Sequence, residues 1–71
     1  MGKIVRRVLD GHITLIEWSP SDHASVEEAE AIFDREVENG FMAVDGDSNK
    51  PVQEFPVDAE LVILTTPMGG G

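Results

Sequence analysis

The sequence predicts a two-layer α+β domain in which one helix packs on a mixed β-sheet. Two short runs rich in Val, Ile, Leu and Thr flank an Asp-Gly pair near the start of the chain. A middle stretch has apolar residues at the spacing of an amphipathic helix, and the most apolar run, residues 61–64, comes close to the end. The 71 residues suffice for one domain, expected at residues 1–66 and followed by a flexible glycine tail at 67–71.

The first two strands are expected at residues 3–9 and 12–18. They flank Asp10 and Gly11, and Asp-Gly is a strong signal for a two-residue hairpin turn. The alternation of apolar and polar residues is not clean in either run, so it does not identify the buried face of the first strand. The two runs predict an antiparallel hairpin.

A helix is expected from about Val26 to Asn39. Residues 25–28 read Ser-Val-Glu-Glu and match a capping box, in which Ser25 would be the N-cap. Gly40 follows as a terminator. The apolar stripe that should face the sheet consists of Val26, Ala29, Phe33 and Val37, with Ile32 beside it.

Three further strand candidates follow the helix, at residues 41–44, 51–55 and 60–66. Pro51 and Pro56 confine the middle candidate to a short edge position, because proline cannot donate a ladder hydrogen bond. The last candidate is the most apolar of all, which suits a strand in the centre of a sheet.

The predicted order, ββαβ(β)β, has a simple unknotted arrangement. With the last strand central and the helix as a right-handed crossover, the first and last strands pair in parallel. This topology is the β-grasp, the ubiquitin-like fold. The residues expected to be mostly buried in its core are Ile4, Ile13, Leu15, Phe33, Val37, Leu61 and Ile63.

Charge and composition exclude several classes of function. Fourteen acidic residues against five basic ones give a formal charge of −9, which disfavours nucleic acid and membrane surfaces and favours a basic partner. The chain has no cysteine, so a thiolate zinc site and a cysteine nucleophile are excluded. Charged residues interrupt the apolar residues near the start, so we expect no signal peptide and no membrane span, and a cytoplasmic protein.

No metal site and no catalytic centre are expected. Residues 45–49 resemble the start of a calcium loop, but Lys50 and Pro56 stand where that loop needs glycine and glutamate. The residue types of a hydrolase triad occur close together as Ser21, Asp22, His23 and Ser25. Side chains so close together in one turn can rarely adopt the geometry of a catalytic triad. A role in capping the helix explains these residues better. The sequence therefore predicts that the protein is not an enzyme.

The predicted helix is strongly acidic. From Asp22 to Glu38 there are seven acidic residues and one arginine. Two interpretations remain open. The acidic face is either a solvated surface that keeps the protein soluble, or a docking surface on which a basic partner would contact Glu27, Glu28 and Glu30.

The end of the chain, DAELVILTTPMGGG, resembles the C-terminus of the prokaryotic sulfur carriers, namely the small subunit of molybdopterin synthase and the thiamine-pathway carrier, and that of ubiquitin. The likeness rests on residues 61–64, Pro67, Gly70 and Gly71 and on the predicted strand order. It implies that an activating enzyme adenylates the carboxylate of Gly71. That enzyme would supply the ATP site, so this protein would need no cofactor of its own.

The same resemblance implies a role as protein modifier or as sulfur carrier, and the sequence does not choose between them. Its partners would be the activating enzyme and, for a modifier, a conjugating enzyme, a protease or a target protein. A modifier would be joined to a lysine of another protein, or to Lys3 or Lys50 of a second copy.

The glycines also have a physical interpretation. A tail without Cβ atoms can enter a narrow channel, where Gly69 and Gly70 would let Gly71 reach the α-phosphate of ATP. The extended chain from Thr65 to Gly71 reaches about 23 Å at ~3.3 Å per residue, enough to enter a partner. In the alternative hypothesis the glycines are incidental, and the protein is a non-covalent acidic interaction module, such as an adaptor or a phage or assembly protein.

Overall fold

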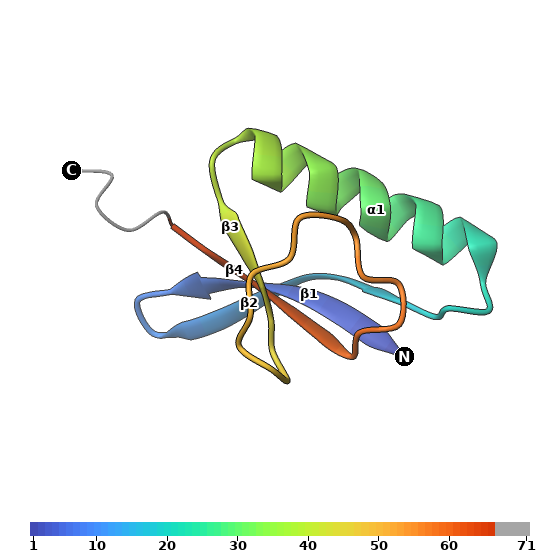
Figure 1. The fold of residues 1–71 in the computed structure, drawn as a ribbon, viewed down its shortest axis with the longest axis horizontal. Coiled ribbons are helices and arrows are strands. Elements are labelled where there is room, and N and C mark those ends of the chain that lie inside the picture. The colour runs from blue at the N-terminus through green and yellow to red at the C-terminus, as the bar shows by residue number, and fades with distance from the viewer. Residues whose placement is uncertain (67–71) are drawn as a thin grey trace.

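One helix and a four-stranded mixed sheet make up the computed structural model, which describes residues 1–66 (Figure 1). The elements, in chain order, are β1 (Gly2–Val8), β2 (Gly11–Trp18), α1 (His23–Glu38), β3 (Met42–Asp45) and β4 (Leu61–Thr65). The helix covers one face of the sheet, so the α+β prediction is confirmed. The predicted tail, residues 67–71, lies outside the described residues.

The sheet has the strand order β2-β1-β4-β3. β4 therefore lies between two strands and pairs in parallel with β1, both as predicted, and it pairs antiparallel with β3. A parallel pair needs a crossover connection, which here contains the helix.

The hairpin of β1 and β2 forms as predicted, but its turn lies one residue earlier. Val8 pairs with Gly11, so Leu9 and Asp10 make the turn. An Asp-Gly turn of type I′ needs positive φ at both residues. Only Gly11 has it, with φ of 133°, and it therefore joins the strand instead.

A β-bulge interrupts the pairing of β1 with β2. Ile4 pairs with Ile16 and Val5 pairs with Thr14, so Leu15 is the extra residue on β2. A bulge resets the alternation of side chains along a strand. The prediction that Ile13 and Leu15 share a buried face was wrong for this reason: Leu15 is half-buried, whereas Ile13 is 51% exposed.

The helix begins one turn earlier than predicted. Asp22 is the N-cap, and its carboxylate accepts hydrogen bonds from the backbone N–H groups of Ala24 (3.1 Å) and Ser25 (3.4 Å). The predicted cap, Ser25, lies inside the first turn, where its hydroxyl donates to the carbonyl of Asp22 at 2.9 Å. Asp22 is an equally good cap residue and stands one turn closer to the preceding bend. The terminator is confirmed, because Gly40 has a φ of 102° after the C-cap.

The buried stripe of the helix runs through Ala29, Phe33 and Glu36. The prediction placed Val37 after Phe33, but Val37 is 38% exposed. Glu36 and Val37 come three and four residues after Phe33, and both spacings place a side chain on the same helix face. The prediction chose Val37 because it is apolar. The sheet instead presents an arginine at this point, and Glu36 turns toward it.

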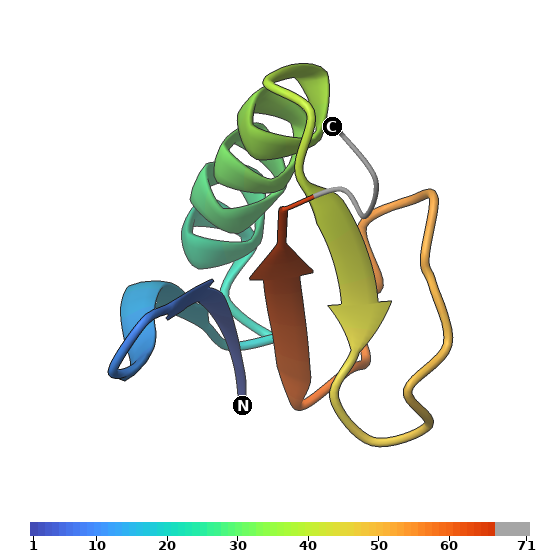
Figure 2. The same ribbon diagram turned by 90° about the vertical axis from the view of Figure 1, so that its left-hand side faces the viewer.

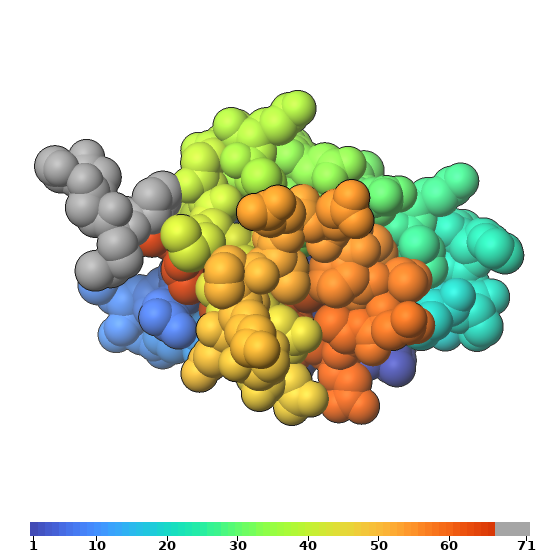
Figure 3. Space-filling model, in the orientation of Figure 1, coloured from blue at the N-terminus to red at the C-terminus, as the bar shows by residue number. Residues whose placement is uncertain are grey.

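The predicted strand at residues 51–55 does not form. Only a single bridge joins Pro51 to Val44, and the segment continues as a loop that covers one side of the core (Figure 3). Phe55 in this loop contacts Trp18 and Phe33, with ring centroids 4.8 and 5.8 Å apart. The indole N–H of Trp18 donates to the carbonyl of Val57 at 3.0 Å. The two prolines prevent a ladder, and aromatic contacts hold the segment in place.

The core between helix and sheet contains other strand residues than those predicted. Its buried members are Ile4, Trp18, Ala29, Phe33, Ala43, Val62 and Leu64. Ile4 and Phe33 were predicted correctly. Leu61 and Ile63 are only half-buried, because β4 directs Val62 and Leu64 toward the helix. Four consecutive apolar residues fit either phase, so the sequence did not decide it.

Candidate functional site

The base of the C-terminal segment is the candidate functional site. β4 carries the chain to this point, and its buried residues Val62 and Leu64 fix it in the core. Thr65, its last residue, pairs with Met42 at the start of β3, and Thr66 is exposed. The predicted reactive residues, Gly69, Gly70 and Gly71, lie beyond the described part of the chain.

An ion pair lies next to this base. Arg6 of β1 pairs with Leu64 in the parallel register, and its guanidinium donates to the carboxylate of Glu36. The guanidinium also lies over the ring of Phe41, 4.8 Å from its centroid. A cation over an aromatic face is attracted by the ring quadrupole. Residues from β1, α1 and the position just before β3 therefore meet beside the end of β4.

Glu36 is the only polar residue buried in the described part of the chain, with 3% exposure. The hydrogen bond from Arg6 lowers the pKa of its carboxyl below the ordinary value of 4.5, against the opposing effect of burial. Arg6 is 36% exposed, so its charge keeps partial contact with water. Without Arg6 the charge of Glu36 would be buried without a partner, whereas without Glu36 the charge of Arg6 would still be in partial contact with water.

This pair was not predicted from the sequence. Arg6 and Glu36 are thirty residues apart and stand in segments predicted as strand and helix. One signal was present: Glu36 lies three residues after Phe33, on the face where an apolar residue was expected.

A shallow apolar groove of about 390 Å³ lies on the other side of the base. It runs along the end of α1 and the edge of β3, and Met42, the partner of Thr65, is one of its walls. Val37 and Met42 are its most exposed large side chains. The remaining lining residues are Gly40, Phe41, Ala43, Pro51, Val52 and Gln53.

The residues predicted to dock a basic partner are exposed on α1, and the candidate acceptors Lys3 and Lys50 are exposed as well. Glu27, Glu28 and Glu30 belong to the helix, Lys3 to β1, and Lys50 to the loop after β3. None of these five residues contributes to the Arg6–Glu36 pair or lines the apolar groove.

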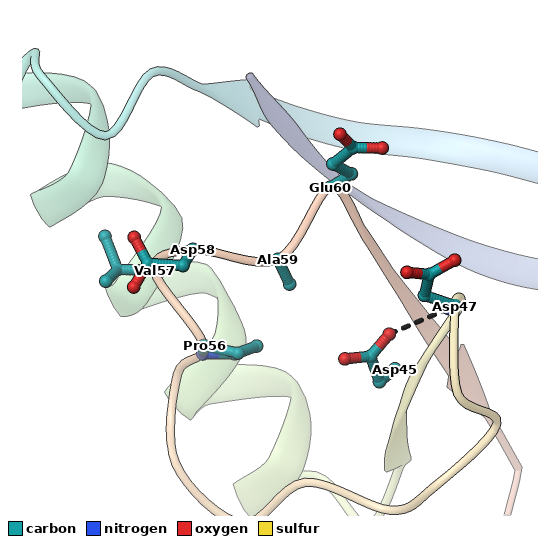
Figure 4. Close-up of a pocket in the computed structure, with 7 residues that line it drawn as sticks. All are labelled: Asp45, Asp47, Pro56, Val57, Asp58, Ala59 and Glu60. Carbon is teal, nitrogen blue, oxygen red and sulfur yellow. Dashed lines mark hydrogen bonds between the residues drawn. The ribbon is translucent and has the colours of Figure 1, made fainter.

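An acidic cleft of about 530 Å³ lies at the opposite end of β4 (Figure 4). Its carboxylates are Asp45, Asp47, Asp58 and Glu60. The carboxylate of Asp45 accepts the backbone N–H of Asp47 at 2.7 Å, so it stabilises its own turn. Among residues 1–66, no group of three acidic or histidine side chains is arranged to hold a metal ion. Residues 46–48 form a turn after β3.

No family model, curated protein or solved structure matches this chain. Across residues 1–66, α1 is neither long nor apolar enough to cross a membrane.

Proposed function

We propose that this chain is a ubiquitin-like β-grasp protein whose Gly71 carboxylate is activated by an adenylating enzyme. The observation that carries the proposal is the position of β4, a central buried strand that leads directly into the glycine segment. The strand order, the parallel pairing of β1 with β4 and the helix between them support the β-grasp assignment. This proposal requires a free carboxylate on Gly71, either at a natural chain end or after cleavage by a protease.

The anchored base supports the proposal because an enzyme must find the reactive end at a defined place. Val62 and Leu64 hold β4 in the core, and the Arg6–Glu36 pair closes the core beside it. A tether that begins at a fixed point keeps the carboxylate at a high effective concentration near a docked enzyme. The apolar groove beside Met42 offers that enzyme a contact surface.

The proposed chemistry needs no catalytic group of this protein. A carboxylate oxygen of Gly71 attacks the α-phosphorus of ATP, and pyrophosphate leaves. A nucleophile then attacks the acyl-adenylate, and AMP leaves. When the nucleophile is hydrosulfide the product is a thiocarboxylate, and when it is a lysine amine the product is an amide; in both cases AMP takes the bonding electrons and a proton is released. The protein is thus a substrate of its partner.

The test is ATP-dependent capture by an activating enzyme from the same source. Deletion of Gly70 and Gly71, or Gly70→Val, should abolish the acyl-adenylate, because a Cβ in a narrow channel clashes. Melting temperature should not change, since the described core ends before these residues. As a matched control, one alanine added before Met1 should leave capture intact, whereas one alanine added after Gly71 should abolish it.

Intact-mass measurement of the protein from its own cells separates the two roles. A carrier gains the mass difference between sulfur and oxygen, whereas a modifier is found joined to a lysine. If neither species forms and the truncated protein keeps full biological activity, the non-covalent interaction module replaces this proposal. In that case reversal of Glu27, Glu28 and Glu30 to lysine should slow association with the basic partner.

A further inference from the structure

The two edges of the sheet are covered differently. Outside β3, the backbone N–H of Asp45 donates to Lys50 and that of Val52 donates to Ala43, both at 2.9 Å. Outside β2, no segment within residues 1–66 forms a strand pair. Figure 2 shows the same contrast, with the blue hairpin on one side of β4 and β3 with its loop on the other. An unpaired edge is a template for another strand.

The backbone of β2 presents hydrogen-bonding groups at defined positions on this edge. The N–H of Lys3 donates to Glu60, so Lys3 and every second residue of β1 after it bond toward β4. Their partners on β2 are therefore not bonded to β1. These partners are His12, Thr14 and Glu17, and their N–H and C=O groups point to the free edge.

The bulge at Leu15 makes this edge self-complementary. In a regular strand, His12 and Glu17 would have side chains on opposite faces, because they are five residues apart. Here His12 lies opposite Arg7 and Glu17 lies opposite Lys3, which places both on the face away from the helix. Because of the extra residue, the side chains of His12 and Glu17 lie on the same face of the sheet. The backbone N–H and C=O groups of both residues also point to the free edge.

Charge also distinguishes this region from the rest of the molecule. The hairpin, residues 2–18, has three basic and two acidic residues, a net charge of +1. Residues 19–66 have two basic and twelve acidic residues, a net charge of −10. Two copies of the chain therefore repel each other least through the hairpin, because the rest of the described chain carries nearly all of the negative charge.

We propose that β2 pairs antiparallel with β2 of a second copy about a two-fold axis between Thr14 and Leu15. In this register His12 faces Glu17 of the second copy, and the two-fold axis makes this pair occur twice. The backbone groups of both residues point toward the other copy, and both side chains lie on the face away from the helix. Ile13 faces Ile16 on the helix side, which buries the strand side chain that the single chain leaves 51% exposed. The result is one continuous sheet with both helices on the same side.

Sedimentation velocity over a concentration series tests the proposal on the full chain. The wild type should dimerise, and His12→Glu or Glu17→Lys should each weaken the dimer about tenfold, because two like-charged or mismatched pairs replace two favourable ones. An equimolar mixture of the two variants should associate again, since each glutamate then faces a lysine or a histidine. Glu54→Lys, an exposed loop change with the same charge difference as Glu17→Lys, should dimerise like the wild type.

A cross-link gives a second measurement that does not depend on charge. The chain has no cysteine, so Ile13→Cys and Ile16→Cys can be made singly and mixed under mild oxidation. Residues opposite each other at a non-hydrogen-bonded position have Cα atoms about 4.5 Å apart, within disulfide range. The mixture should cross-link, and a mixture of Ile16→Cys with Ser48→Cys should not. The proposal is overturned if the wild type is monomeric. It is also overturned if neither charge change weakens the dimer and no cross-link forms.

Discussion

The two ends of the layer between helix and sheet are closed in different ways. At the end that contains Trp18, this ring and that of Phe33, from the second half of α1, contact Phe55, and apolar burial stabilises the layer. At the end where the helix finishes, Arg6 and Glu36 form a partly buried ion pair beside Phe41. Apolar burial needs no particular partner and no particular pH. An ion pair needs both partners in their charged forms. Loss of one partner or a change of pH can therefore weaken the second end.

The largest expected effect is at the aromatic end. Phe33→Ala should lower the free energy of unfolding by about 3–5 kcal/mol, because the ring is fully buried against Phe55 and the strands. Urea denaturation measures it. Ile32→Ala on the same helix is the matched control and should cost clearly less, since Ile32 is half-buried. Equal costs would mean that Phe33 is not the buried anchor of the aromatic end.

The next effect is at the ionic end, and it is asymmetric. Arg6→Met should cost about 3 kcal/mol, because it leaves the carboxylate of Glu36 buried without its partner. Glu36→Gln should cost about 1–2 kcal/mol, since Arg6 is partly exposed and water can replace the lost acceptor. The same denaturation series measures both. A larger loss for Glu36→Gln would show that Arg6 is the dependent partner.

A third change overpacks the aromatic end. Gly2 lies on the ring of Trp18, and a Cβ there would stand 2.4 Å from that ring and 2.5 Å from the carbonyl oxygen of Ala59. Gly2→Ala should therefore cost about 1–3 kcal/mol. Gly11→Ala is not a useful control, because its φ is positive, so Lys3→Ala on the same strand serves instead. A Gly2→Ala protein as stable as the wild type would mean that the loop at 56–60 can move outward freely.

The smallest expected effect is the pH dependence of the ionic end. The pKa of Glu36 is lowered in the folded state, so its contribution is complete above the ordinary value of 4.5 and is lost as pH falls through the lowered folded value. The stability difference between wild type and Glu36→Gln should thus shrink below pH 4.5. Glu30→Gln, an exposed change on the same helix, controls for the general effect of acid. A constant difference would contradict the assigned pKa direction.

The sequence by itself determined the order of the helix and of the four strands that form, although it also predicted a strand at residues 51–55 that does not form. The hairpin, the helix and the central strand each follow from a local pattern: two β-rich runs separated by a short turn, a 3.6-residue apolar period and a short apolar run. The glycine segment and its proposed role also come from the sequence, and they remain predictions.

Tertiary structure alone decided which side chains face which partner. The run at 61–64 fits either phase, and only packing against the helix chose Val62 and Leu64. Glu36 took a core position because Arg6, thirty residues away, supplies a charge there. The bulge at Leu15 turned His12 and Glu17 to one face through its pairing with β1. Each outcome depends on contacts between residues far apart in the chain, and local periodicity contains no information about such contacts.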